Sequence, residues 1–260
     1  MSDQARPGAR NLITDVPGLK VGQAEDASVR SGVTVILPAQ PAVAGCDVRG
    51  GGPGTRETDA LAPENLVDAI HAIVLSGGSV YGLATADAVT AVLGARGVGY
   101  AFAPLSTTPA APVVPAAILY DLGNGGDKAW GLDPPYRRLG LAAMENASET
   151  FTLGTAGAGF GAMAGRLKGG TGSASIVTSD GIVVGAIAAV NSFGAVTAPG
   201  GRSFWAAPFE IDGEFGGLGA DGLNYPLQDG LMAGLNLTPR DFEETTQQVS
   251  EALCQSEVLF

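Results

Sequence analysis

The chain has 260 residues, of which 45% are hydrophobic and 15% are charged, and its formal net charge is −12. This length predicts a single domain over residues 1–260, and the hydrophobic content is sufficient for a sizeable core, which excludes a disordered chain. The negative charge repels phosphate backbones and anionic lipid. We therefore expect neither a nucleic acid nor a membrane surface as a partner.

The sequence lacks the features of a membrane or secreted protein, which bears on the cellular compartment. No apolar run reaches the roughly 20 residues of a membrane-spanning helix, and the first residues, MSDQARPGARN, lack the apolar segment of a secretory signal. We expect residues 1–10 to be a flexible N-terminus. Cys46 and Cys254 are too few for a disulfide framework and too far apart for a metal motif. These features predict a cytoplasmic protein.

Apolar runs and helix signals alternate along the chain and predict an α/β fold. Several strand-like runs are apolar at successive positions, which predicts sheets covered on both faces. In chain order, we expect a strand at 32–38, a helix at 63–73, a strand at 72–78, a helix at 82–97, a strand at 113–122, a helix at 136–147, strands at 173–179, 182–194 and 203–212, and a helix at 237–260.

The chain has 40 glycines, roughly twice the average usage of ~7%. Glycine at this density within apolar segments indicates sharp turns or close approach of backbones. One glycine-rich loop, VRGGGPGTRETD, places glycines 50–54 between Arg49 and Arg56, and it fits a solvated loop and a site-lining loop equally well. The other, GAGFGAMAGRLKGGTGSAS at 157–175, surrounds Lys168.

The common catalytic motifs do not fit. A Ser-His-Asp triad would need His71, the one histidine, which lies in the predicted helix 63–73, and no serine has glycine at both −2 and +2. Zinc and Walker motifs are absent. GAGFGA at 157–162 matches a dinucleotide fingerprint, with Asp180 about twenty residues later, but the flanking strand and helix signals are weak. We expect no metal and no cofactor.

Polar residues at predicted strand ends form the remaining candidate site. Each one alone is typical of a structural role, but together they supply an amide, a phenol, an ammonium group and glycine N–H groups, which are suited to stabilising an oxyanion. The set consists of Asn191, Tyr120, Lys168 and the SGGS turn at 76–79.

These same segments resemble a known family. VDAIHAIVLSGGSVYGLATADAV resembles the Gly-Gly-Ser core of the DmpA-type self-processing aminopeptidases, which include the nylon-oligomer hydrolases. The resemblance covers most of residues 11–217 in the expected order. It continues through NLITDVPGLKVGQAED, GVTVILP, DVRGGGPGTRETD, AAILYDLG, GAGFGAMAGRLKGGTGSAS, VVGAIAAVNSFG and PFEIDGEFGG.

The resemblance implies a layered α-β-β-α sandwich, with two buried β-sheets flanked by helices. It also implies a precursor that cuts itself once and frees a Ser or Thr nucleophile at the start of a β chain, whose α-amine acts as base. By motif, Asn191 would help to hold the oxyanion, Lys168 would orient or tune the nucleophile, and Tyr120 would hydrogen-bond near the reacting carbonyl. Gly77, Gly78 and Ser79 would line the substrate pocket.

The C-terminal segment departs from the family. Family precursors continue into a motif resembling Asn-Thr-Thr followed by a strand, and no such junction follows GEFGG here. One interpretation is that the chain is an α subunit, that a separate β chain supplies the nucleophile, and that αβ units assemble into an oligomer. A second is that EVLF at 257–260 is the remnant of a tag-removal protease site.

The resulting hypothesis is an amide-bond hydrolase, either an aminopeptidase or an oligoamide hydrolase. Its substrates would be small peptides, amino-acid amides or short polyamide oligomers. Two alternatives remain open, an acyltransferase of the ornithine-acetyltransferase type and a catalytically incomplete binding protein.

Overall fold

The computed structural model describes residues 5–101, 108–165 and 167–192, together with 194, 196–198, 202–210, 213, 216, 217 and 219. The chain divides into two compact units, unit 1 with residues 1–163 and 168–191, and unit 2 with residues 164–167 and 192–260. The single domain expected over residues 1–260 stays a prediction. The helix expected at 237–260, Cys254 and residues 257–260 lie outside the described residues. No helix in the described ranges is long and apolar enough to cross a membrane.

A five-stranded mixed sheet forms the centre of unit 1. β2 (Leu19–Asp26), which the sequence did not predict as a strand, pairs antiparallel with β3 (Ser31–Pro38) over eight residues. β5 (Ile73–Ser76) and β6 (Ala116–Ile118) pair in parallel, and the chain that connects them contains the helix α1 (Ala84–Ala95). Six consecutive residues of β3 are buried, as its unbroken apolar run predicts. In spatial order the strands are β2 (Leu19–Asp26), β3 (Ser31–Pro38), β5 (Ile73–Ser76), β6 (Ala116–Ile118) and β4 (Thr55–Arg56).

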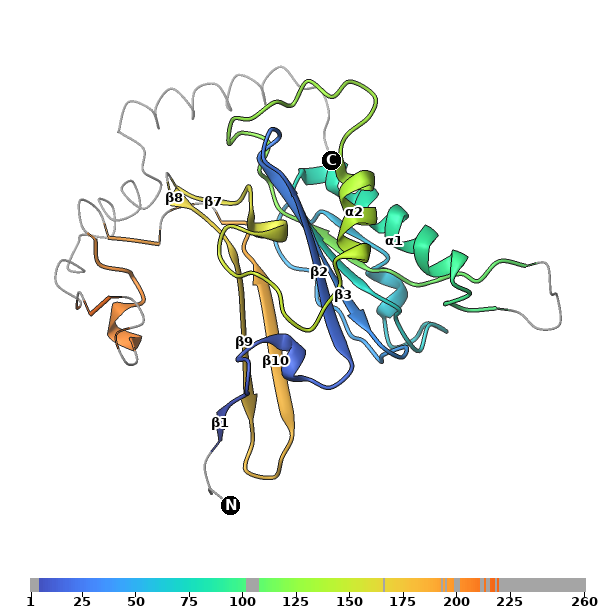
Figure 1. Ribbon diagram of the computed structural model, residues 1–260, viewed down its shortest axis with the longest axis horizontal. Coiled ribbons are helices and arrows are strands. Elements are labelled where there is room, and N and C mark those ends of the chain that lie inside the picture. The colour runs from blue at the N-terminus through green and yellow to red at the C-terminus, as the bar shows by residue number, and fades with distance from the viewer. Residues whose placement is uncertain are drawn as a thin grey trace. The chain divides into compact units, whose positions relative to one another are not determined.

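Two helices pack on this sheet and enclose the core. α1 (Ala84–Ala95) and α2 (Tyr136–Glu145) confirm the helices predicted at 82–97 and 136–147, and Gly97, with φ +71°, follows the end of α1. Both helices lie on one side of β2 and β3, with β9 and β10 on the other side (Figure 1). The core between sheet and helices includes Val33, Val35, Val74, Val89 and Leu139.

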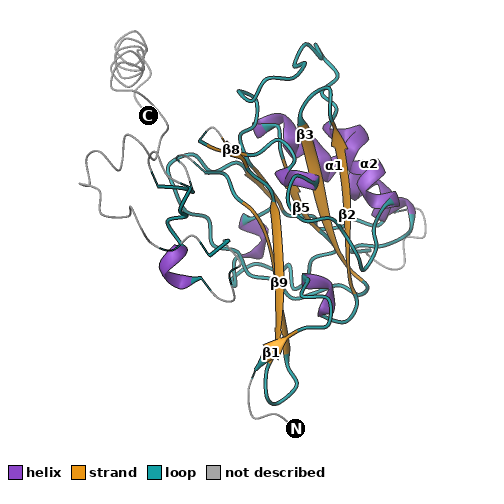
Figure 2. Cartoon of the chain, turned by 60° about the vertical axis from the view of Figure 1, so that its left-hand side comes forward, coloured by secondary structure: helices purple, strands orange, loops and turns teal. Residues whose placement is uncertain are grey.

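A second, three-stranded sheet joins the N-terminal segment to the strands predicted at 173–179 and 182–194 (Figure 2). Its order is β1 (Arg6–Pro7), β9 (Thr171–Val177) and β10 (Val183–Ala189), all antiparallel. β1 lies within the N-terminal segment that the sequence assigned to a flexible N-terminus. The expectation of two fully covered sheets is not met among the described residues, because every position of β10 is at least partly exposed.

The expected helix at 63–73 is wrong, because long-range pairing replaces it. Ile70 exchanges both backbone hydrogen bonds with Ala42, and the N–H of His71 donates to the carbonyl of Val113. The ring of His71 is buried, and its Nδ1 accepts a 3.0 Å hydrogen bond from the N–H of Val113. These backbone bonds place His71 in an extended segment rather than in a helix. Because the lone pair of Nδ1 is occupied, the ring has a structural role.

In unit 2, the strand expected at 203–212 is also wrong over its described part. Phe204 forms one isolated bridge with Thr197, and a 3₁₀ turn, η5 (Ala207–Phe209), follows. Pro208 lies in the first turn of η5. Proline lacks the N–H that a central strand would need and has a φ suited to a helical turn, which explains why the strand stops.

Short elements complete the described chain. They are four further 3₁₀ turns, η1 (Ile13–Asp15), η2 (Asp59–Leu61), η3 (Ser79–Leu83) and η4 (Gly157–Gly159), and the paired strands β7 (Met163–Ala164) and β8 (Leu167–Lys168).

The glycine-rich segment at 157–175 packs backbone against backbone. A Cβ on Gly159 would lie 2.1 Å from the carbonyl carbon of Gly170, and one on Gly32 of β3 would lie 2.2 Å from the carbonyl oxygen of Gly157. The N–H of Ala158 donates to Oγ1 of Thr34 at 2.9 Å. Close backbone approach thus explains Gly159 and Gly170 of this segment, whereas an added Cβ on Gly172 would have no neighbour within 4 Å.

The carboxylate of Asp121 joins three parts of unit 1. It is 1% exposed, and it accepts 2.7 Å hydrogen bonds from Ser31 Oγ at the start of β3 and from the N–H of Gly78 in the turn after β5. A Cβ on Gly161 would lie 2.4 Å from Oδ2 of Asp121. Burial raises the pKa of Asp121, while the hydrogen bonds from Ser31 and Gly78 oppose that shift.

The close packing of α2 on β2 gives a stability test. A Cβ on Gly22 would lie 1.9 Å from the carbonyl oxygen of Ala143 in α2. Gly22→Ala should therefore lower the free energy of unfolding by about 1–3 kcal/mol, as overpacking does. Gly172→Ala in β9 is the matched control, because an added Cβ there has no neighbour within 4 Å. Urea unfolding would contradict the packing if both variants changed stability equally.

The buried charge of Asp121 gives a pH test. Because its pKa is raised in the folded state, the folded chain holds this proton more tightly than the unfolded chain. Its contribution to stability is therefore present at low pH and decreases as pH rises above the unfolded value of about 3.9. The stability of Asp121→Asn relative to the unchanged protein should improve between pH 4 and pH 7, measured by urea unfolding.

Asp15 is a control for this test, because its pKa is shifted in the opposite direction, below the usual value. The hydrogen bond from Ser175 is the largest of several interactions that lower the pKa of Asp15. Its contribution is therefore present above the unfolded pKa of about 3.9 and is lost as pH falls. The stability of Asp15→Asn relative to the unchanged protein should therefore improve as the pH is lowered from about 4 to about 2 and stay nearly constant between about pH 5 and pH 7. Parallel pH profiles for both variants and the unchanged protein would contradict the assignment.

Candidate functional site

Two strand ends meet at Tyr120 and Asn191. Tyr120 follows β6 and Asn191 follows β10, and the backbone N–H of Tyr120 donates to Oδ1 of Asn191 at 2.8 Å. The side chain of Tyr120 is exposed. The structure thus brings together two of the residues predicted from the sequence, and the contact uses the backbone of one and the side chain of the other.

This contact orients the amide of Asn191. Because a backbone N–H can only donate, the atom that faces it must be the amide oxygen, so Nδ2 points away from Tyr120. Within the described part of the chain, Nδ2 has no hydrogen-bond partner. Asn191 therefore presents two N–H donors that a carbonyl or oxyanion oxygen could accept.

The turn at 77–79 uses its own N–H groups within the fold. Gly77 donates to the carbonyl of Gly32 at 2.9 Å, Gly78 to Asp121, and Ser79 to the carbonyl of Leu119 at 3.0 Å. Gly78 has φ +86°, and a Cβ there would lie 2.0 Å from the ring of Tyr136, so glycine is required. The turn holds the strand end before Tyr120, and its contact with substrate stays a prediction.

Two ionisable groups, Tyr136 and Lys128, interact with the charge of Asp121. Burial raises the pKa of Tyr136 to about 12, so its hydroxyl is neutral at ordinary pH. Burial also lowers the pKa of Lys128, although the nearby charge of Asp121 opposes that shift. Nζ of Lys128 donates to the carbonyl of Val29 and, at 3.1 Å, to Oδ1 of Asn124.

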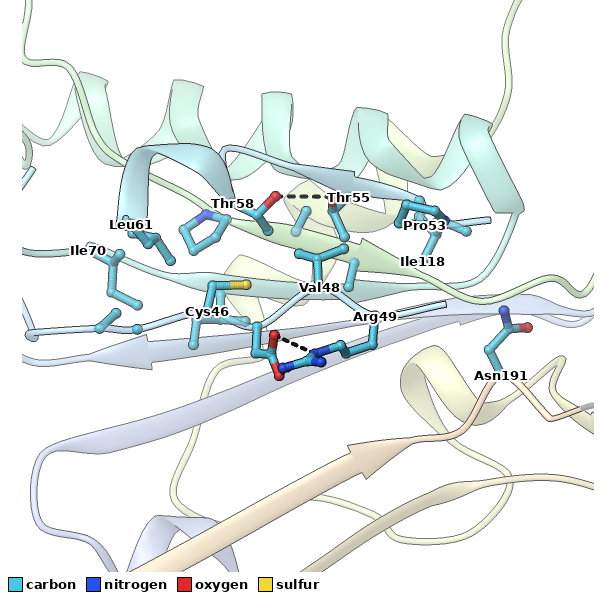
Figure 3. Close-up of a pocket in the computed structure, with 18 of the residues that line it drawn as sticks. Cys46, Val48, Arg49, Pro53, Thr55, Thr58, Leu61, Ile70, Ile118 and Asn191 are labelled. Carbon is cyan, nitrogen blue, oxygen red and sulfur yellow. Dashed lines mark hydrogen bonds and ion pairs between the residues drawn. The ribbon is translucent and has the colours of Figure 1, made fainter. Parts of the chain in front are cut away.

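A pocket of about 350 Å³ lies beside Asn191 (Figure 3). The glycine-rich loop at 50–54, which the sequence left open between a solvated and a site-lining role, contributes Gly52, Pro53 and Gly54 to the lining. Arg49 also lines the pocket, whereas Arg56 pairs with Asp87 in α1. Part of this loop therefore lines a cavity, as one of the two sequence interpretations required.

Lys168 lines a different pocket, of about 340 Å³, together with Arg30, Asn124 and Phe160. Its side chain is exposed, and it has no ion pair or hydrogen bond within the described ranges. The described chain thus joins Tyr120 to Asn191 but brings Lys168 into contact with neither. The Gly161 backbone lines the pocket of Lys168 and packs against Asp121, which links the two regions.

The sequence reasoning missed Asp121, Asn124 and Lys128. Asn124 Nδ2 donates to the carbonyls of Arg30 and Gly161, both at 2.7 Å, and so joins the loop after β2 to the glycine-rich segment. Strand-end polarity could have identified two of the missed residues, because Asp121 and Asn124 lie in the same segment, YDLGN, as Tyr120.

Comparison with known proteins gives a consistent result. The model of peptidase family S58 matches residues 11–215. An uncharacterized aminopeptidase of Mycobacterium tuberculosis is 42% identical over 213 residues, covering 79% of this chain and 59% of its own length. A 6-aminohexanoate-oligomer endohydrolase of Kocuria sp. is 34% identical over 164 residues, covering 62% of this chain and 41% of its own length.

Solved structures agree. A Burkholderia sp. β-aminopeptidase superimposes with a TM-score of 0.59 at 26% identity, covering 75% of this chain and 56% of its own. The L-aminopeptidase D-Ala-esterase/amidase of Ochrobactrum anthropi, described as a variant of the Ntn hydrolase fold, has a TM-score of 0.52 at 25% identity, covering 65% and 49%. The chain thus spans less than 60% of the length of these curated relatives and solved structures. Because the family model matches well over half of the chain, the chain belongs to peptidase family S58.

Proposed function

We propose that the chain is the α subunit of an N-terminal-nucleophile amide hydrolase that acts on peptides or other linear amides. The observation that carries this proposal is the oriented Nδ2 of Asn191, which has no hydrogen-bond partner in the described part of the chain and lies beside a pocket. Two N–H donors fixed in this way are suited to the negative charge that develops on a carbonyl oxygen during amide cleavage. Membership of peptidase family S58 supports the same class of reaction.

The reaction would proceed through an acyl-enzyme. A Ser or Thr hydroxyl at the start of a β chain attacks the amide carbon, and the α-amine of that residue takes the hydroxyl proton. The carbonyl oxygen becomes negative and is held by Asn191, with Tyr120 nearby. The C–N bond then breaks, the amine leaves with the proton, and water hydrolyses the acyl-enzyme. Lys168 would favour the reaction by its positive charge near the nucleophile.

The same proposal completes the fold as a layered α-β-β-α sandwich. On the three-stranded sheet, Ile176 and Val184 are 43% and 54% exposed among the described residues. Apolar side chains on a strand pair are ordinarily covered by a further layer. We propose that the β chain supplies that layer and that the αβ units form an oligomer.

The composition of the purified protein tests the arrangement. Coexpression of this chain with the coding sequence that follows it should yield two polypeptides that copurify, the shorter of which begins with Ser or Thr. Intact-mass measurement and N-terminal sequencing would detect them. An active preparation that contains a single 260-residue species would rule out a separate nucleophile chain.

Substitution of Asn191 tests the site. Asn191→Asp keeps the oxygen that accepts the N–H of Tyr120 but replaces the Nδ2 donors with a second oxygen. Loss of an oxyanion donor should lower kcat by on the order of 10²-fold or more. Asn191→Ala should also lose the Tyr120 hydrogen bond, which contributes about 0.5–1.5 kcal/mol to stability. Amide hydrolysis and thermal unfolding, measured together, separate the two effects.

Lys168→Ala should lower kcat as well, because the site loses a positive charge. Lys20→Ala is its control, since Lys20 is an exposed lysine of β2 and lines neither pocket. If Asn191→Asp and Lys168→Ala hydrolyse amides at the rate of the unchanged protein, these residues do not form the catalytic site.

A further inference from the structure

The lining of the pocket beside Asn191 is largely apolar and uncharged. Ile70 and Ile73 come from β5 and the segment before it, and Ala116, Ala117 and Ile118 come from β6. In Figure 3 the side chains of Leu61, Ile70 and Val48 lie around Cys46, Ile118 lies beyond Val48 toward Pro53, and Asn191 lies at the far end. A ligand group that enters this space exchanges water for aliphatic surface, which favours aliphatic over polar ligand groups.

The polar groups of this lining mostly bind one another. The hydroxyls of Thr55 and Thr58 are 3.0 Å apart and form a hydrogen bond. The two charged residues, Asp47 and Arg49, form an ion pair of 2.8 Å, and their side chains are 70% and 84% exposed. The charges therefore lie in solvent and neutralise each other, and they leave no counter-ion for a charged ligand group inside the pocket.

The amide of Asn191 differs from the rest of the lining, because its two Nδ2 donors have no partner among the described residues. We propose that the pocket binds an uncharged aliphatic group of the substrate while Nδ2 of Asn191 holds the carbonyl oxygen of the attached amide. This inference rests on the proposed function and adds a substrate class. The preferred amides carry an unbranched or branched aliphatic side chain or N-substituent beside the scissile bond, and amides with a carboxylate or ammonium on that side chain or N-substituent are poor substrates.

Two series of amides test the proposal on the protein purified with its β chain. One series varies the acyl side, with glycyl, valyl, leucyl and aspartyl p-nitroanilides. The other varies the amine side, with glycine amides of methylamine, butylamine and β-alanine. In one series kcat/KM should rise roughly fourfold or more per buried methylene group and fall for the charged member. The series that responds identifies which side of the bond occupies the pocket.

A matched pair of variants ties the preference to the pocket. Ile73, 37% exposed, lines the pocket, whereas Val43, 91% exposed, does not. Ile73→Asp should reduce kcat/KM at least tenfold more for the aliphatic substrate than for the glycyl substrate, because glycine has no side chain to place beside the new charge. Val43→Asp introduces the same charge outside the pocket and should leave both rates unchanged. Thermal unfolding of both variants checks that they are folded.

Cys46 provides a measurement that needs no catalysis. Its thiol is exposed and lines the pocket, and in a Cys254→Ser background it is the one cysteine of this chain. Hexanamide should slow alkylation of Cys46 by N-ethylmaleimide in a saturable manner, and succinamate, with its carboxylate, should not. Protection by hexanamide that is lost in Ile73→Asp would support the proposal.

The outcomes separate this inference from the proposed function. Amide hydrolysis without dependence on chain length, together with unprotected Cys46, would overturn the pocket and leave the hydrolase. Absence of hydrolysis for every amide would overturn the proposed function, and protection of Cys46 by hexanamide would then still identify an aliphatic-binding pocket. Cys46 that reacts only in denaturant would show that another part of the protein fills the space, and would overturn the inference.

Discussion

A buried carboxylate is stable only where hydrogen bonds replace the water that it loses, and the candidate site depends on one such group. Asp121 accepts hydrogen bonds from the start of β3 and from the turn after β5, and the glycine-rich segment packs against it at Gly161. Because Tyr120 immediately precedes Asp121, these contacts also fix the backbone N–H that binds Asn191. The orientation of the candidate oxyanion donor therefore follows from a buried charge that need not take part in the chemistry.

Glycine is what makes this arrangement sterically possible. The turn after β5 and the glycine-rich segment can both approach this carboxylate because Gly77 and Gly161 have no Cβ, and an added Cβ would lie 2.1 Å and 2.4 Å, respectively, from Oδ2 of Asp121. Some of the glycines in unit 1 are therefore required by the close packing around Asp121. The glycines of the loop at 50–52 are different, since an added Cβ would meet no atom within 4 Å there.

The sequence predicted correctly those elements whose pattern of apolar residues lies within a few neighbouring positions. The apolar run of β3 and the helical spacing of α1 and α2 were sufficient, because burial and helix periodicity act within a few residues. The helix at 63–73 failed because Ile70 and His71 pair with residues 42 and 113, which lie far away in the sequence. β2 was not predicted, because its glycine, glutamine and acidic residues interrupt the apolar pattern of a strand. It becomes a stable strand only by packing against β3 and α2. In the site, strand-end polarity found Tyr120 and Asn191, but the importance of Asp121 depends on burial that no single segment reveals.

The contact between Tyr120 and Asn191 separates two roles at one position. The backbone N–H of Tyr120 orients the side-chain amide of Asn191, and the exposed side chain of Tyr120 takes no part in this hydrogen bond. Every amino acid except proline offers the same N–H. The side chain at position 120 can therefore be exchanged for that of any residue except proline without loss of the hydrogen bond that orients Asn191.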